Sequence, residues 1–430
     1  MAPFPIYCAM LCLMWNDFTE ERRKEMQKLK TFSKIFGEMI SFLKEHYASK
    51  ICENSHIYNA VAHLKEADRA IKEISEIALN GLFDRNLSFP EEQFSECRVA
   101  MQTCCRVGVL TIERDVISRK RRRDVNVPSF VVSTVSFPHK LFQEYVAGLY
   151  IADVYANDTA EYDRLKDKLF PRFEEFRYLF YFSSALGSEL GLDIIKSLIN
   201  YADKNFCVDA AFECYTEKAI RAVGERWEEY ELSSYMSEHT KAGVVFMVYC
   251  NQVPSLSIAD VNCGRTMSRD LAEGMGSSSV LREVSIRSSQ FHSTFYKILS
   301  EKASNCQVGG DLAQWVCTMP NLSSFSVDCD YLPVEFFSTA ADLAESSHIQ
   351  DLTLYSRDDS QHRSSLEGAL ARLVYTMPRL SSFSVNCRSF PDDFISTAID
   401  MAQNCQVYVY TLTETWFNFA PLPVCQWEHL

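Results

Sequence analysis

Two segments in the C-terminal part of the chain repeat each other closely, and this repeat constrains the fold more than any other feature. MPNLSSFSVDCDYLPVEFFSTAADLAES begins at Met319, and MPRLSSFSVNCRSFPDDFISTAIDMAQN begins at Met377. The offset of 58 residues fits two units of 29, because the apolar pair Leu352 and Leu354 occupies the intermediate strand position. Similarity at a fixed period is typical of proteins that stack one supersecondary unit after another.

Each repeated unit combines a short strand with a helix. Apolar and polar residues alternate through the strand, and a turn and a helix follow it. Pro333 and Pro391 suit the first turn of that helix, where the N–H that proline lacks is not needed. Strands with the same alternation begin earlier, near Val284 and Ser255. A strand and a helix in about 20–29 residues are typical of a leucine-rich repeat, so we predict a solenoid over residues 236–412.

The array of repeats is expected to be imperfect. The strand positions Ile286 and Val327 are 41 residues apart, and residues 305–319 lack a strand of their own. Residues 413–430 fit no repeat and are predicted to form an irregular tail.

The parallel strands of such a solenoid line a concave face, and their outward residues are candidates for binding a partner. These residues are small and polar, which suits a protein partner better than a small molecule. The predicted contact residues are Ser323, Ser326, Asp328, Thr353, Tyr355, Ser384 and Asn386.

The first half of the chain is predicted to consist of helices around one hairpin. Apolar residues recur at helical spacing over residues 32–43 and 60–82. Two β-rich runs, at residues 107–112 and 127–137, enclose a polar and strongly basic segment, which indicates a hairpin with a long tip. A helix follows from Leu141. Helices, a hairpin and a further helix in this order are typical of a winged-helix module.

The run SFPHKLFQEYVAGLYIAD (Ser136–Asp153) resembles the F-x-H-x-x-x-Q-E-[YF] signature of NLR-type receptors, the nucleotide-binding proteins of innate immunity. Weaker resemblances to this family are PIYCAMLCLMW from Pro5, ALNGLF from Ala78, VGVL from Val107 and AAFECYTE from Ala210. They occur in the family's order, with the repeats last, and resemble the NLR-like proteins of invertebrate deuterostomes.

The resemblance implies a multidomain chain with an α-helical and winged-helix N-terminal half and an α/β leucine-rich-repeat C-terminal half. The implied parts are a helical domain that follows the family's NACHT core, a winged-helix domain, a second helical domain, the repeats and the tail. They are expected at residues 1–50, 51–155, 156–235, 236–412 and 413–430.

The family's ATPase core would bring the P-loop string G-x-x-x-x-G-K-[ST], which is not present in this sequence. The chain is therefore expected to correspond to a portion of the family C-terminal to that core, and not to act as an enzyme. Two positions carry over from the family as nucleotide-binding residues: Pro5 would pack on the adenine, and His139 would contact a phosphate. We expect no cofactor and no metal, and ADP or ATP only where a NACHT core is supplied upstream.

Charge and hydropathy exclude other classes of protein. The net charge of −14 and the pI near 5.2 argue against nucleic-acid binding, which needs a basic face. The basic run at residues 119–123 is interpreted as a solvated loop, with a nuclear-localisation or acidic-surface patch as the alternative. The sequence contains no stretch of about 20 apolar residues, so no membrane span is predicted.

The sixteen cysteines include no C-x-x-C pair and mostly lie in apolar runs. We interpret them as reduced, buried thiols of a cytoplasmic protein. Secretion with disulfides is the alternative, and the three N-x-[ST] sequons at Asn86, Asn157 and Asn321 would suit it.

Three functions stay open at this point. The first is a non-catalytic scaffold of innate immune sensing or its regulation, whose repeats bind proteins such as other NLR chains or microbial ligands. The second is the C-terminal fragment of an ATP-switched, oligomerising signalling NTPase. The third is a secreted leucine-rich-repeat binding protein.

Overall fold

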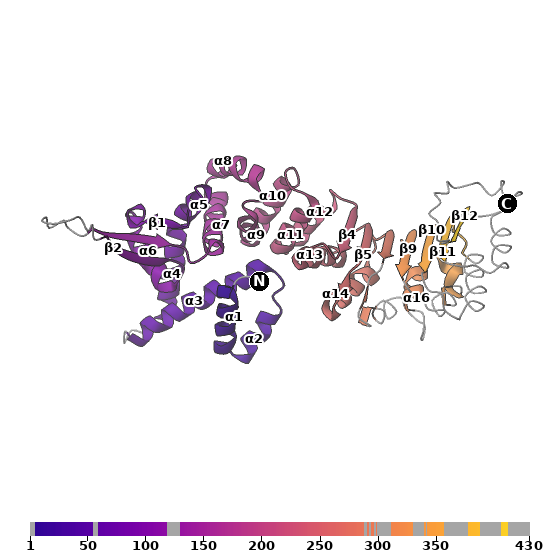
Figure 1. Ribbon diagram of the computed structural model, residues 1–430, viewed down its shortest axis with the longest axis horizontal. Helices are drawn as coiled ribbons and strands as arrows, with labels where there is room; N and C mark the ends of the chain where they lie inside the picture. The colour runs from indigo at the N-terminus through magenta and orange to yellow at the C-terminus, as the bar shows by residue number, and fades with distance from the viewer. Residues whose placement is uncertain are drawn as a thin grey trace, which may run out of the picture. The chain divides into compact units, whose positions relative to one another are not determined.

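The structure is a computed structural model, and Figure 1 shows its helices and strands. It describes residues 5–54, 59–117, 130–287, 290–291, 294–295, 298, 311–329, 339–340, 342–356, 377–387 and 406–411. The chain divides into two compact units, Met1–Ala222 and Val223–Leu430, which are described separately.

The first unit is mainly helical. Its helices are α1 (Pro5–Asp17), α2 (Glu20–Gln27), α3 (Phe32–Asn54), α4 (Ala60–Glu73), α5 (Ser75–Phe83), η1 (Glu91–Phe94), α6 (Arg98–Val107), α7 (Lys140–Asn157), α8 (Thr159–Leu169), η2 (Phe170–Arg172), α9 (Arg177–Ala185), α10 (Ser188–Leu198) and α11 (Lys204–Cys214). Helix α12 (Glu217–Gly224) crosses the boundary between the two units. The helix predicted over residues 60–82 is divided into α4 and α5, because Ile74 leaves the helical conformation.

A three-stranded antiparallel sheet lies among these helices. It consists of β1 (Ser88–Pro90), β2 (Thr111–Ile117) and β3 (Phe130–Ser136) in the order β1-β3-β2. The predicted hairpin is confirmed by the pairing of β2 with β3, in which Thr111 lies opposite Ser136. The basic run at its predicted tip lies outside the described residues. Strand β1 was not predicted, because three residues are too few to show an alternating pattern.

Helix α7 lies at the centre of the first unit, against α5 and α9. Aromatic rings from three helices pack together beside it: the centroid of Phe36 lies 5.3 Å from that of Phe142 and 4.9 Å from that of Phe182. All three side chains are buried, and burying one such side chain contributes about 1.5–3 kcal/mol. This aromatic cluster connects α3, α7 and α9, which are distant in the sequence.

Two buried polar side chains also join distant segments of the first unit. The Gln143 side chain on α7 donates hydrogen bonds to the carbonyl oxygens of Ala78 and Asn86, at 3.1 and 2.9 Å. The Glu213 carboxylate on α11 accepts from the backbone N–H groups of Phe32 and Ser33, at 2.9 and 2.8 Å. A carboxylate at this place satisfies unpaired N–H groups and complements the dipole of α3.

The second unit contains a seven-stranded sheet in the order β12-β11-β10-β9-β7-β5-β4, and all its neighbouring strands are parallel. The strands are β4 (Glu229–Ser233), β5 (Ser255–Ala259), β7 (Glu283–Arg287), β9 (Ser324–Cys329), β10 (Asp351–Ser356), β11 (Ser382–Cys387) and β12 (Gln406–Thr411). Its other elements are α13 (Glu238–Tyr249), α14 (Arg265–Ser277), α16 (Asp311–Thr318), η3 (Ala344–Ser346) and the parallel pair β6 (Asn262–Cys263) and β8 (Gln290–Phe291).

The predicted fold class is wrong. The described residues are mainly helical with smaller sheets, and no leucine-rich-repeat solenoid is found among them. A regular repeat needs the same link after every strand, whereas the described links differ. Helix α13 follows β4, β6 and α14 follow β5, and both β8 and α16 lie between β7 and β9, whose first residues are 41 positions apart. The alternating pattern correctly indicates strands, but it does not specify the segments that join them. The predicted first helical turns at Pro333 and Pro391 and the tail at residues 413–430 lie outside the described residues, whereas residues 339–340 and 342–343, in the later part of the helix predicted after Pro333, are helical.

A second expectation is also wrong. Residues 229–233 were expected to belong to the second helical domain, but they form strand β4. Its sequence, EYELS, alternates strictly: Tyr230 and Leu232 are buried, while Glu229 and Glu231 are exposed. This period of two is typical of a half-buried strand and not of a helix. The pattern was therefore visible in the sequence and was missed because the surrounding residues are helical.

Candidate functional site

Alternation of side chains gives the parallel sheet one apolar side and one polar side. The apolar side carries Tyr230, Leu256, Val284, Phe325, Leu352 and Phe383 in register, and each of them is buried. The residues between them belong to the opposite side of the sheet, since successive strand residues point to opposite faces. This opposite side is called the polar face here.

Three rows of residues cross the polar face, one residue from each strand. The first row is Glu229, Ser255, Glu283, Ser324, Asp351, Ser382 and Gln406. The second row is Glu231, Ser257, Ser285, Ser326, Thr353, Ser384 and Tyr408. The third row is Ser233, Ala259, Arg287, Asp328, Tyr355, Asn386 and Tyr410.

The register brings most of the predicted contact residues together. Ser326, Thr353 and Ser384 are neighbours in the second row, and each is partly exposed. Asp328, Tyr355 and Asn386 are neighbours in the third row by backbone register, and their side chains lie outside the described residues.

Ser323 is different, because it precedes β9 and belongs to no row. Its backbone N–H and its hydroxyl both donate to the carbonyl oxygen of Arg282, at 2.8 and 3.3 Å. The hydroxyl therefore holds the turn before the strand. This use makes Ser323 a weaker candidate for partner contact than the three residues of the second row.

The sequence interpretation missed the charged residues of the first row. Glu229, Glu283 and Asp351 are exposed and stand at the first position of β4, β7 and β10. Neither the first row nor the second contains a lysine or an arginine. These residues could have been predicted from the sequence, because in each of the three strands an acidic residue directly precedes the first of two alternating apolar residues.

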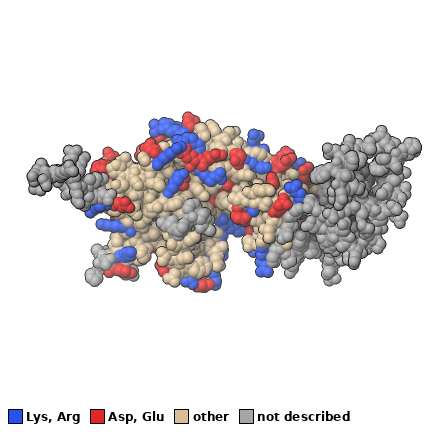
Figure 2. All heavy atoms as spheres, viewed as in Figure 1, with Lys and Arg blue, Asp and Glu red and all other residues tan. Residues whose placement is uncertain are grey.

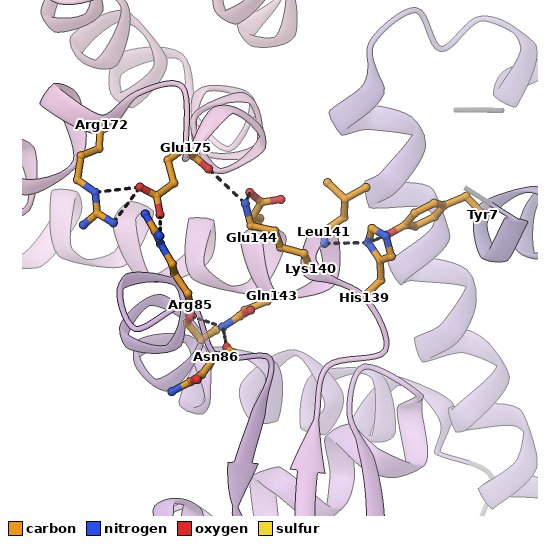
Figure 3. Close-up of polar contacts among 11 residues, drawn as sticks. Tyr7, Arg85, Asn86, His139, Lys140, Leu141, Gln143, Glu144, Arg172 and Glu175 are labelled. Carbon is orange, nitrogen blue, oxygen red and sulfur yellow. Dashed lines mark hydrogen bonds and ion pairs between the residues drawn. The ribbon is translucent and has the colours of Figure 1, made fainter. Parts of the chain in front are cut away.

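The second predicted site lies in the first unit, at the start of α7 (Figure 3). His139 is the N-cap residue of α7, and its Nδ1 accepts a hydrogen bond from the backbone N–H of Leu141 at 3.2 Å. The Tyr7 hydroxyl, from α1, lies 3.0 Å from the same nitrogen. Burial lowers the pKa of His139, which favours the neutral imidazole that can accept these hydrogen bonds.

Pro5 begins α1, two residues before Tyr7, and its side chain lies outside the described residues. The residue that meets His139 is therefore Tyr7, which the sequence interpretation did not single out. Tyr7 is fully buried, and its ring makes an edge contact with the imidazole at a centroid distance of 5.3 Å. Tyr7 and His139 are 132 positions apart in the sequence, so only the three-dimensional contact reveals that they form a pair.

Glu144 is the most unusual group near the start of α7. It is only 1% exposed, and its charged neighbour is the Nζ of Lys140 at 3.1 Å. This ion pair lacks hydrogen-bond geometry, so neither carboxylate oxygen has a hydrogen-bond partner within the described part of the chain. Burial raises the pKa of Glu144 to about 7, although Lys140 acts in the opposite direction.

An exposed ion cluster lies on the other side of Lys140 (Figure 3). The Glu175 carboxylate pairs with Arg85 at 3.0 Å and with Arg172 at 2.9 Å, and its backbone carbonyl accepts from Lys140 at 3.2 Å. Both arginines lower the pKa of Glu175. Exposed pairs of this kind contribute little to stability, so the cluster mainly orients the start of α7.

The described residues form neither a recognisable metal centre nor a membrane-spanning helix. They contain no group of three or more His, Cys, Asp or Glu side chains that could hold a metal ion. No described helix is both long and apolar enough to cross a bilayer. Figure 2 shows basic and acidic side chains interspersed on the described surface that faces the viewer.

None of the cysteines whose side chains the structure describes forms a disulfide. Cys207, Cys263 and Cys317 are buried, and burial raises their pKa values to about 12, 11 and 12. Cys8 and Cys12 are exposed on α1, which corrects the expectation that cysteines in apolar runs are buried.

No protein-family model matches this chain, and no curated protein matches it. The resemblance of residues 136–153 to NLR-type receptors therefore stays a prediction.

Proposed function

We propose that this chain is a non-catalytic, protein-binding scaffold of the NLR type, which acts in innate immune sensing or in its regulation. The observation that carries this proposal is the alignment of Ser326, Thr353 and Ser384 in one row of the polar face. The partner would be a protein, such as another NLR chain or a microbial protein, and the encounter would occur in the cytoplasm.

A row of small hydroxyl side chains on a parallel sheet has properties that suit a protein partner. The strands are fixed from the other side by buried residues such as Phe325 and Leu352, so the row presents a rigid surface. Each hydroxyl can donate and accept hydrogen bonds, and its small size lets a partner approach the strands closely. Polar contacts between two pre-formed surfaces are typical of non-obligate protein interfaces.

The NLR part of the proposal is supported by the run at residues 136–153. Its histidine, His139, is the N-cap of α7, and its glutamine, Gln143, ties α7 to α5 and to the segment before β1. These roles would organise the first unit in the absence of any nucleotide. Binding of ADP or ATP belongs to the proposal only where a NACHT core is supplied upstream.

Position-specific photo-crosslinking tests the proposal. A benzophenone amino acid placed at Thr353 of the full chain should crosslink one discrete protein in cell extract, and the same group at exposed Tyr201 of the first unit should not. The double variant Ser326→Arg and Ser384→Arg should abolish that crosslink. It should also weaken binding of the purified partner at least about tenfold. Equal products from Thr353 and Tyr201 would refute binding at the polar face.

A further inference from the structure

The polar face carries negative charge at a regular spacing. Glu229, Glu283 and Asp351 occupy the first row on β4, β7 and β10, and one strand with a serine in that row separates each from the next. Neighbouring strands lie about 4.8 Å apart, so the backbone positions of successive acidic residues are about 10 Å apart. All three side chains are exposed.

The first two rows themselves contain no lysine or arginine. Glu231 adds a further exposed carboxylate in the second row, and the other described members of the two rows are serine and threonine. Arg287 lies in the third row, where its Nη2 is 3.8 Å from the Asp260 carboxylate. Carboxylates of one sign on a rigid surface create a negative potential that attracts a cationic partner.

The spacing of the carboxylates matches a specific conformation of the partner. A polyproline II segment has three residues per turn and rises about 3.1 Å per residue, so every third side chain lies on one side at about 9 Å intervals. A β-strand does not fit, because residues three apart point to opposite sides. Basic residues at every third position of a polyproline II segment would therefore meet Glu229, Glu283 and Asp351 in turn.

The hydroxyl groups between the carboxylates favour the same conformation. An α-helix also brings side chains to one face about every 10 Å, at seven-residue intervals, but its backbone groups are already paired within the helix. A polyproline II segment has no internal hydrogen bonds. Its N–H and C=O groups are free to pair with the hydroxyls of Ser255 and Ser324 in the first row and of Ser285 in the second.

We infer that the first and second rows bind an extended, cationic segment of a partner protein, in polyproline II conformation, with lysine or arginine at every third position. This inference rests on the proposed function and specifies the partner's chemistry. The partner's cations pair with the three carboxylates, and its backbone pairs with the hydroxyls between them.

Fluorescence anisotropy with labelled synthetic peptides and the full chain tests the inference. The first peptide is Arg-Pro-Pro repeated four times, and the second contains the same residues with all four arginines contiguous. A third peptide is alanine-rich and helical, with arginines seven residues apart. The spaced peptide should bind at least about tenfold more tightly than either control, and added salt should weaken its binding, because exposed charges are screened.

A matched pair of triple variants locates the binding site. Glu229→Gln, Glu283→Gln and Asp351→Asn together remove three charges with little change in shape, and should weaken binding of the spaced peptide about tenfold. The control removes three charges from the first unit, at Glu25, Asp163 and Glu189, whose side chains are 70%, 62% and 62% exposed. It should change binding less than twofold. Circular dichroism of both variants should match the parent chain.

Each other outcome overturns a defined part of the inference. Equal binding of the spaced and contiguous peptides would overturn the spacing, and stronger binding of the helical peptide would overturn the polyproline II conformation. Equal losses in both triple variants would overturn the site. Absence of peptide binding, while the crosslink from Thr353 persists, would overturn the cationic partner but leave the proposed function standing. Loss of the crosslink as well would overturn both.

Discussion

Replacing the buried Glu144 by glutamine should stabilise the protein above neutral pH and have little effect in acid. The carboxyl is 1% exposed, and burial raises its pKa from 4.5 to about 7. A raised pKa means that the folded state holds the proton more tightly than the unfolded state. The stability contributed by the protonated form is therefore complete below pH 4.5 and is lost as the pH rises through 7.

The size of this effect follows from the pKa of Glu144. Each pKa unit corresponds to about 1.4 kcal/mol, so an ionised Glu144 lowers the free energy of unfolding by about 3 kcal/mol at pH 8. The opposing attraction of Lys140 is already contained in that pKa, and the phenols of Tyr7 and Tyr178 are the other titratable groups that interact with this carboxyl. Glutamine keeps the shape of the side chain and removes the charge.

Guanidinium chloride denaturation, followed by far-UV circular dichroism at pH 4.5 and pH 8, measures the prediction. Glu144→Gln should exceed the parent chain by about 3 kcal/mol at pH 8, and by a much smaller amount at pH 4.5. The control Glu174→Gln changes an exposed residue and should differ by less than about 0.5 kcal/mol at either pH. A Glu144→Gln chain that is less stable than the parent at pH 8 would refute the reasoning. So would an equal difference at both pH values.

Two further substitutions test contacts that hold the first unit together. Gly81→Ala places a Cβ in steric overlap with the ring of Phe89, so it should destabilise by about 2 kcal/mol in chemical denaturation, whereas Gly37→Ala meets nothing within 4 Å and should not destabilise. Glu213→Gln leaves one of the first two N–H groups of α3 without its acceptor and should destabilise by about 1–2 kcal/mol. Glu189→Gln, at an exposed position, is the matched control, and equal midpoints for the two glutamine variants would contradict the role of Glu213.

Local patterns in the sequence predicted individual helices and strands better than they predicted how these elements are connected. The hairpin of β2 and β3 follows from two β-rich runs around a polar segment, and α7 follows from apolar residues at helical spacing. Strands β5, β7, β9, β10 and β11 of the second unit follow from alternation near Ser255, at Val284, at Leu352 and in the two repeated segments, whereas β4 and β12 were not predicted. The solenoid did not follow, because alternation fixes the side of a strand that is buried and says nothing of the segments that connect strands.

The candidate sites show the same limit. Ser326, Thr353 and Ser384 could be predicted as neighbours because the repeat aligns them, and the register of β9, β10 and β11 confirms that alignment. Tyr7 could not be linked to His139, because no sequence pattern relates two residues 132 positions apart. The burial of Glu144 was equally hidden, since a glutamate in the first turns of a helix is usually exposed.

Two buried polar groups of the first unit share one physical property that the sequence interpretation did not reveal. Glu213 meets the start of α3, and Gln143 meets the carbonyl oxygens of Ala78 and Asn86, so each satisfies backbone groups of a distant segment. Such groups cost free energy when they are buried without a partner, so these contacts specify how the helices are joined. On the polar face, by contrast, hydroxyls and carboxylates stand on strands whose backbone is already paired within the sheet. These polar side chains of the first unit therefore serve the fold, while every described side chain of the first two rows is at least partly exposed.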